Sequence, residues 1–131
     1  MNAVLLLTVA LQLPSLASLP GEWAGSSTCT GVRPACTNES VVYDMRARDD
    51  HTLHVAAYKI VDGRRVLMGE SDYVYDAARR TLTSDVTTPS LHIVWELTVA
   101  GDGTIAGTLT QLPDRSIVRN LTLKKATQSV R

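Results

Sequence analysis

Hydrophobic and polar residues alternate along most of the chain with a period of two. The clearest example runs from Leu91 to Val99, where every second position is apolar and mostly polar residues lie between. Such alternation is typical of a β-strand with one buried face. Turn residues, among them Asp62 and Gly63, divide the pattern into separate runs. We predict eight strands, at 21–29, 39–48, 51–60, 64–75, 81–87, 90–99, 104–112 and 115–124.

The connections between these strands are short, and none has the length and periodicity of a helix. Parallel crossovers are therefore excluded, and neighbouring strands are antiparallel. Eight such strands leave an unpaired edge at both ends, which is removed when the last strand pairs with the first. The predicted fold is all-β: a single eight-stranded antiparallel up-and-down barrel. A two-sheet β-sandwich is the alternative. A chain of 131 residues with no linker or repeat predicts one domain.

Charge and composition narrow the possible partners. The chain has 13 basic and 13 acidic side chains, which gives no net charge. Nucleic acids and anionic membrane surfaces attract proteins with clustered positive charge, so we expect neither as a partner. Valine and threonine are abundant and phenylalanine is absent, which agrees with a strand-rich fold.

The N-terminus resembles an export signal. An apolar run at 3–13 is too short to span a bilayer, which needs about 20 residues. Pro14 follows it, and Ser15 and Ala17 are small residues at the positions that signal peptidase reads. We predict a signal peptide at 1–17, a mature domain at 18–131, and a secreted or periplasmic protein without a membrane span. A buried first helix or strand is the alternative.

Cys29 and Cys36 are the only cysteines. Their spacing differs from the C-x-x-C of redox and zinc sites. In an oxidising compartment they are expected to form one disulfide, which would close a short loop. Two free thiols in a cytosolic protein are the alternative.

Gly21 and Trp23 form a G-x-W motif at the start of the first strand. This motif, in a chain with eight predicted strands, resembles the lipocalin and calycin superfamily. The resemblance implies that Trp23 plugs the closed end of the barrel and that a basic residue near the end of the last strand, Arg119 or Lys125, packs across it. The longer pattern, with Gly25 and the two cysteines, also resembles a group of small exported bacterial proteins. This second resemblance adds nothing about activity.

The end opposite Trp23 would be the open mouth of the barrel, with the 29–38 loop at its rim. Alternation places apolar side chains and a few polar ones inside, which fits a small apolar or amphipathic ligand. Gly69 and Gly107 add no side-chain volume and so leave space. The alternative is that the inward residues simply fill the barrel. The candidate ligand-binding residues are Tyr43, Ser71, Tyr73, Ile93, Trp95, Leu109 and Gln111.

The sequence shows no catalytic motif. His51 and His54 point to opposite faces of a strand and cannot chelate one metal ion, and His92 lies elsewhere. We therefore predict no metal and no cofactor, and we name no catalytic residue. A small barrel enzyme is the third interpretation, which this pattern favours least.

Two functions are compatible with this pattern. The first is an exported barrel that binds a small apolar or amphipathic ligand in its lumen. The second is a protein of the cell envelope that binds or inhibits a protein partner through the 30–37 loop. The disulfide and Pro34 would restrain that loop, so little conformational entropy would be lost on docking.

Overall fold

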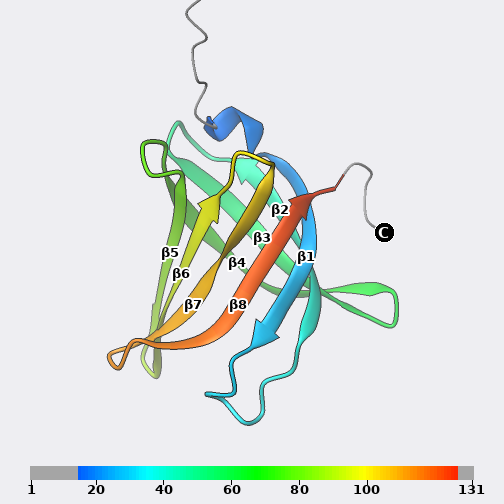
Figure 1. Cartoon of the computed structure of the whole chain (residues 1–131), viewed down its shortest axis with the longest axis vertical. Helices are drawn as coiled ribbons and strands as arrows, with labels where there is room; N and C mark the ends of the chain where they lie inside the picture. The colour runs from blue at the N-terminus through cyan, green and yellow to red at the C-terminus, as the bar shows by residue number, and fades with distance from the viewer. Residues whose placement is uncertain (1–14, 127–131) are drawn as a thin grey trace, which may run out of the picture.

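The computed structural model describes residues 15–126, which form a short 3-10 helix and eight β-strands (Figure 1). The elements are η1 (Leu16–Ser18), β1 (Gly21–Cys29), β2 (Glu39–Ala47), β3 (Thr52–Val61), β4 (Arg64–Asp76), β5 (Thr81–Thr88), β6 (Leu91–Val99), β7 (Thr104–Leu112) and β8 (Ser116–Lys125).

The strands close into a barrel. Each strand pairs antiparallel with its neighbours in the sequence, and β8 also pairs with β1, where Lys125 lies opposite Trp23. The predicted barrel is thus confirmed, and the sandwich alternative is wrong. β3 and β4 are joined at Asp62 and Gly63, whose φ angles of 51° and 74° give the left-handed backbone that a tight hairpin needs.

The barrel is packed by apolar side chains that every strand sends inward. Leu97 and Val99 are buried, and Trp95 packs partly buried against the same cluster, so the alternation in β6 points inward as predicted. The buried cluster comprises Leu19, Trp23, Val41, Tyr43, Met45, Leu53, Val55, Tyr73, Tyr75, Leu82, Leu97, Val99, Ile105, Leu121 and Leu123.

A bulge changes the inward face at the start of β8. Simple alternation places Ile117 inside together with Leu121. The β7–β8 register shifts between Leu109 and Thr110, so that Ile117 is 46% exposed and Val118 is 1% exposed. A β-bulge adds one unpaired residue to a strand, and this reverses the facing of the residues on one side of it. Simple alternation is therefore wrong for Ile117, which faces outward.

One end of the barrel, uppermost in Figure 1, is closed by η1 and the start of β1. Trp23 is 3% exposed there, and its Nε1–H donates to the Leu19 carbonyl at 2.8 Å. Lys125 Nζ lies 5.7 Å from the centre of the Trp23 ring and donates to the Ser18 carbonyl at 2.8 Å. Arg119, the other candidate for this contact, lies near the opposite end and makes no such contact. It points into the mouth because its pairing with Cys29 places it at the far end of β1.

The ladder between β4 and β5 is short. Only Val74–Asp76 pair with Thr81–Thr83, although β4 extends from Arg64 to Asp76. Below these pairs the two strands diverge, and the β3–β4 hairpin leans away from β5 and β6 in Figure 1. In the described chain, the rest of β4 therefore has a partner strand on its β3 side alone.

The predicted signal peptide lies mostly outside the described residues. Within them, Leu16 packs partly buried against the core at the closed end. Over residues 15–126, the structure contains no helix that is long and apolar enough to cross a membrane.

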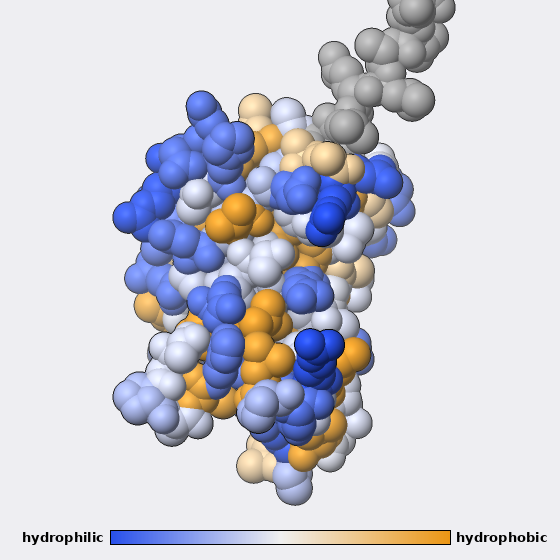
Figure 2. Space-filling view, turned by 90° about the vertical axis from the view of Figure 1, so that its left-hand side faces the viewer, coloured by the Kyte–Doolittle hydropathy of each residue, from blue (hydrophilic) through white to orange (hydrophobic). Residues whose placement is uncertain are grey.

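The outer surface mixes hydrophobic and hydrophilic side chains. On the side shown in Figure 2, hydrophobic side chains lie among polar ones and continue toward the lower, open end. The outer faces of β6, β7 and β8 form a shallow groove there, which is lined by Val94, Glu96, Thr108, Thr110, Leu112, Arg115 and Ile117.

Candidate functional site

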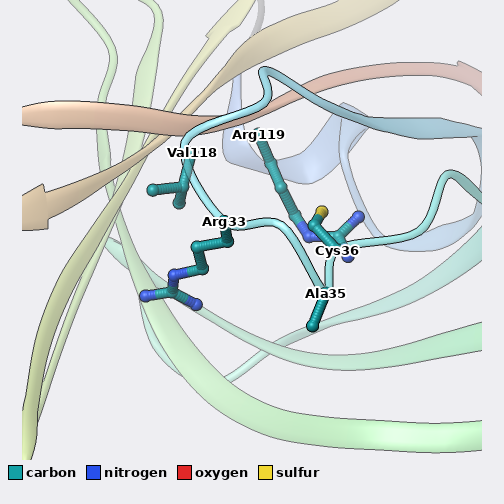
Figure 3. A pocket seen from close by; sticks show the side chains of 5 residues that line it. All are labelled: Arg33, Ala35, Cys36, Val118 and Arg119. Carbon is teal, nitrogen blue, oxygen red and sulfur yellow. The ribbon is translucent and has the colours of Figure 1, made fainter.

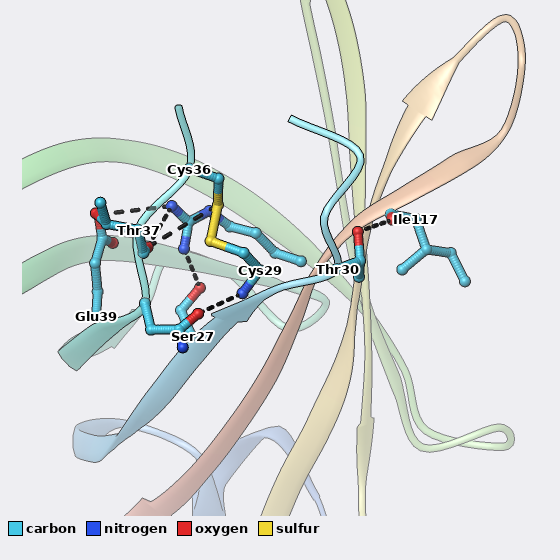
Figure 4. The surroundings of a disulfide bond; sticks show 9 residues. Ser27, Cys29, Thr30, Cys36, Thr37, Glu39 and Ile117 are labelled. Atoms are coloured by element: carbon cyan, nitrogen blue, oxygen red, sulfur yellow. Dashed lines mark hydrogen bonds and ion pairs between the residues drawn. A yellow bond between two sulfur atoms is a disulfide. The ribbon is translucent and has the colours of Figure 1, made fainter. Parts of the chain in front are cut away.

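The disulfide loop lies at the open end of the barrel, the lower end of Figure 1. Cys29 and Cys36 are bonded, with their Cα atoms 6.0 Å apart, and the predicted disulfide is confirmed. The loop is also fixed to the barrel by hydrogen bonds (Figure 4). The Cys29 amide donates to Asn38 Oδ1 at 2.8 Å, and Thr30 Oγ1 donates to the Ile117 carbonyl at 2.6 Å. We call residues 30–37 the lid.

A pocket of about 220 Å³ lies between the lid and β8. Figure 3 shows its lining, to which the lid contributes one arginine and the start of β8 another. The bulge in β8 brings Val118 and Arg119 to this pocket, one after the other in the sequence. The five lining residues are Arg33, Ala35, Cys36, Val118 and Arg119.

Arg119 connects the lid to the strands beneath it. Its Nη1 donates to Ser27 Oγ at 3.1 Å, and its Nη2 donates to the Thr37 carbonyl at 3.1 Å (Figure 4). Nη2 also lies 3.6 Å from Glu39 Oε1, and the two side chains are 19% and 17% exposed. This ion pair is therefore largely shielded from water, and it carries one positive and one negative charge.

Arg33 extends from the lid to the inner face of β7. Its Nε and Nη2 both donate to Gln111 Oε1, at 3.1 and 2.6 Å. Among the described residues, no carboxylate is within ion-pair distance of Arg33. Its side chain is half-buried. A cation that has only a neutral amide as partner thus spans the mouth.

Tyr43 and Tyr73 lie beneath this polar layer, each 2% exposed. Burial raises the pKa of Tyr43 well above its ordinary value, with the charge of Arg119 opposing the shift and that of Glu39 adding to it. Burial also raises the pKa of Tyr73, with Tyr43 adding to the shift and a hydrogen bond with Ser71 opposing it. Both phenols stay neutral at physiological pH and keep a hydroxyl proton to donate.

The other predicted site residues lie on β6 and β7. Trp95 pairs with Leu109, and Ile93 pairs with Gln111, which Arg33 contacts. Leu109 is 5% exposed, whereas Ile93, Trp95 and Gln111 are partly exposed. The predicted ligand-binding residues thus fall into two groups. The tyrosines on β2 and β4 are buried, whereas those on β6 and β7, apart from Leu109, are partly exposed.

The two glycines expected to leave space differ. A Cβ added at Gly69 would meet nothing within 4 Å, so this part of β4 is open. A Cβ at Gly107 would overlap with the carbonyl of Glu96 and the Cα of Leu97. Gly107 therefore permits close packing of β6 and β7 and leaves no space.

Sequence reasoning missed Arg33 and Val118. Arg33 is on a loop, where alternation carries no information about direction. Val118 lies at a β-bulge, and the local sequence pattern does not predict this bulge. One signal could have indicated Arg33. It lies between two cysteines that were expected to bond, and such a disulfide holds the loop over the end of the barrel.

A second polar cluster lies on the outside, between β3 and β4. His54 Nδ1 is 2.9 Å from Asp72 Oδ1, and its Nε2 is 3.3 Å from Glu70 Oε1. The hydrogen bonds with Asp72 and Glu70 raise the pKa of His54 above its ordinary value. Within residues 15–126, no group of three or more histidine, cysteine, aspartate or glutamate side chains is arranged to hold a metal ion.

Comparison with known proteins defines the class of this fold. No protein-family description matches the chain, and no curated protein is similar to it. Solved structures of redesigned β-barrels are similar. One, b11L5F_LGL, has a TM-score of 0.60 and 24% identity over 82% of this chain and 91% of that chain.

Two further structures cover 82% of this chain and 94% of their own at 19% identity. They are the redesigned barrel mFAP1 bound to DFHBI, with a TM-score of 0.59, and EF1p2_mFAP2b bound to DFHBI, with a TM-score of 0.58. The chain is thus a small closed β-barrel of the same architecture as these proteins.

Proposed function

We propose that the protein binds a small amphipathic molecule in the open half of its lumen, beneath the lid. The observation that carries this proposal is the combination of an apolar and a polar wall at one mouth. Ile93 and Trp95 face inward yet remain partly exposed. Gln111 pairs with Ile93, Arg119 pairs with Leu109 next to Trp95, and Arg33 contacts Gln111. Small-molecule sites combine apolar lining with a few polar groups in this way.

The designed barrels support the proposal by example. mFAP1 and EF1p2_mFAP2b hold DFHBI, so a barrel of this size can accommodate a small molecule. An eight-stranded barrel has room for side chains or for one small ligand. We place the ligand in the open half, where Ile93, Trp95 and Gln111 remain partly exposed. The residues proposed to contact it are Tyr43, Ser71, Tyr73, Ile93, Trp95, Leu109 and Gln111.

Tryptophan fluorescence offers a direct test, because Trp23 lies at the closed end whereas Trp95 lies midway along β6 and is partly exposed. In the Trp23→Phe variant Trp95 is the sole reporter, and the matched Trp95→Phe variant reports only on the closed end. We expect saturable quenching or a blue shift with 1-anilinonaphthalene-8-sulfonate in the first variant and no change in the second. Equal responses, or none, would contradict binding in the open half.

The 30–37 lid supports a second candidate function, recognition of a protein partner. Val32 is 49% exposed on this loop, which the disulfide and the Thr30 hydrogen bonds hold in place. A restrained loop with an exposed apolar side chain loses little entropy when it docks. For such a partner, Val32→Asp should reduce protein binding and leave small-molecule binding unchanged.

We also propose export and kinship with lipocalin-like barrels. Trp23 at the closed end, with Lys125 over its ring, supports the kinship. Cleavage after Ala17 would remove Leu16 but retain Ser18 and Leu19, which bond Lys125 and Trp23. The intact mass of the protein recovered from the culture medium or periplasm tests this cleavage site. A mass that includes residues 1–17 would contradict it.

A further inference from the structure

The pocket under the lid contains more positive than negative charge. Arg33 and Arg119 both line it, and Glu39, which pairs with Arg119 at 3.6 Å, supplies the carboxylate nearby. In the described structure, Arg33 has no such partner. The three groups together leave one positive charge in a half-enclosed space, where interactions between charges are stronger than in bulk water.

The bond between Arg33 and Gln111 can be exchanged for a stronger one. Both guanidinium N–H groups converge on a single amide oxygen, at 3.1 and 2.6 Å. A carboxylate offers two charged oxygens in a geometry that matches the guanidinium fork, and such charge-assisted pairs are about twice as strong as neutral ones. Gln111 therefore holds the arginine in the pocket without neutralising it.

Apolar side chains lie next to Gln111 on the inner face of β6. Gln111 pairs with Ile93 across β6 and β7, and Trp95 lies two residues further along β6. Both Ile93 and Trp95 face inward and are partly exposed. A ligand whose charged group reaches Arg33 would thus have its hydrocarbon part against Ile93 and Trp95.

We infer that the pocket recognises the carboxylate of a small amphipathic acid through Arg33, whose charge is balanced by no carboxylate of the described chain. This inference rests on the proposed function and specifies its ligand. One uncompensated positive charge favours a monoanion, because a dianion would leave an excess of negative charge beside Glu39. The volume of about 220 Å³ limits the head and adjacent atoms to a small group, below the about 300 Å³ of common drug-sized sites.

Octanoate and 1-octanol test this inference, because they share a hydrocarbon chain and differ in charge. Binding to the full protein is measured by titration calorimetry and by Trp95 fluorescence in the Trp23→Phe variant. We expect octanoate to bind at least tenfold more tightly than 1-octanol. In Arg33→Gln, octanoate affinity should fall by about ten- to a hundredfold, as expected for loss of a charge-assisted bond, with 1-octanol affinity unchanged.

Arg115→Gln is the matched control. Arg115 is an exposed arginine on the β7–β8 turn at the same end of the barrel, and it does not line the pocket. Its replacement removes the same charge and should change octanoate affinity less than twofold. An equal loss in both variants would show general charge attraction and overturn the inference. Far-ultraviolet circular dichroism and an intact disulfide establish that each variant is folded.

The remaining outcomes separate the two proposals. If octanoate and 1-octanol bind equally well to the wild-type protein, recognition of the carboxylate is wrong and binding in the lumen stands. If octanoate binds but Arg33→Gln has no effect, the pocket is not where the acid lies. If neither compound binds, nor any 1-anilinonaphthalene-8-sulfonate, the proposed function itself is overturned, and this inference with it.

Discussion

Replacement of Trp23 by alanine should remove the largest contact at the closed end of the barrel. The indole is 3% exposed, donates a hydrogen bond to the Leu19 carbonyl and lies beneath Lys125 Nζ. Truncation of a buried tryptophan to alanine costs about 3–5 kcal/mol. Here the Leu19 carbonyl also loses its donor, which places the expected loss in the upper part of that range, about 4–5 kcal/mol.

Two variants separate the contributions. Trp23→Phe retains an aromatic ring and loses the Nε1–H group, so we expect a loss of about 1–2 kcal/mol. Lys125→Met largely retains the length of the side chain and removes both its charge above the ring and its hydrogen bond to the Ser18 carbonyl, which together should cost about 1–3 kcal/mol. Trp95→Ala is the control midway along β6, where loss of the partly exposed side chain should cost less than loss of Trp23.

Urea unfolding followed by far-ultraviolet circular dichroism gives these free energies. Small domains are stable by about 5–15 kcal/mol, so Trp23→Ala should lower the unfolding midpoint greatly or leave a partly unfolded protein. A loss below about 1 kcal/mol, with the slope of the transition unchanged, would refute the assignment of Trp23 as the plug of the barrel.

Three further predictions follow from single features. Gly107→Ala should destabilise the barrel by about 1–3 kcal/mol through overpacking, whereas Gly69→Ala, which meets open space, should change the free energy of unfolding by less than about 0.5 kcal/mol. The hydrogen bond with Asp72 raises the pKa of His54 above 6.5 in the folded state. The stabilisation of the folded state by protonated His54 is therefore fully present below pH 6.5. It is lost as the pH rises through the higher pKa that His54 has in the folded state. The fall in Tm between pH 6 and 8 should be smaller in His54→Gln, and an unchanged fall would contradict this. Reduction of the disulfide should speed amide exchange in the 30–37 lid while circular dichroism still shows the barrel, since the bridge lies outside the buried cluster. Collapse of the barrel on reduction would contradict the description of the lid.

The barrel could be predicted from the sequence because the patterns that determine it are local and recur in each strand and turn. Alternation in segments such as 91–99 sets the inward face, and turn residues such as Asp62 and Gly63 set the hairpins. Closure then follows from the need to pair two free edges. The structure has all these features, and each strand bound lies within one residue of the predicted one.

The mouth could be predicted only in part, because its geometry depends on contacts between distant segments. Tyr43 and Tyr73 follow the alternation and lie inside as expected. Arg119 follows it too, but its partners are Ser27 and Thr37. The β1–β8 register brings Arg119 near Ser27, and the path of the lid brings Thr37 to it. Arg33 belongs to no alternating segment, and its bond with a residue of β7 depends on the path of the lid.

The short β4–β5 ladder determines where the barrel can most easily widen. Just three residue pairs, Val74–Asp76 with Thr81–Thr83, join these two strands. Few hydrogen bonds have to break there, so local opening at this seam needs less free energy than at the longer ladders. Transient opening of the barrel is therefore expected at the β4–β5 seam. The other ladders keep their pairing when this seam opens, so a change in the width of the barrel stays confined to the β4–β5 side.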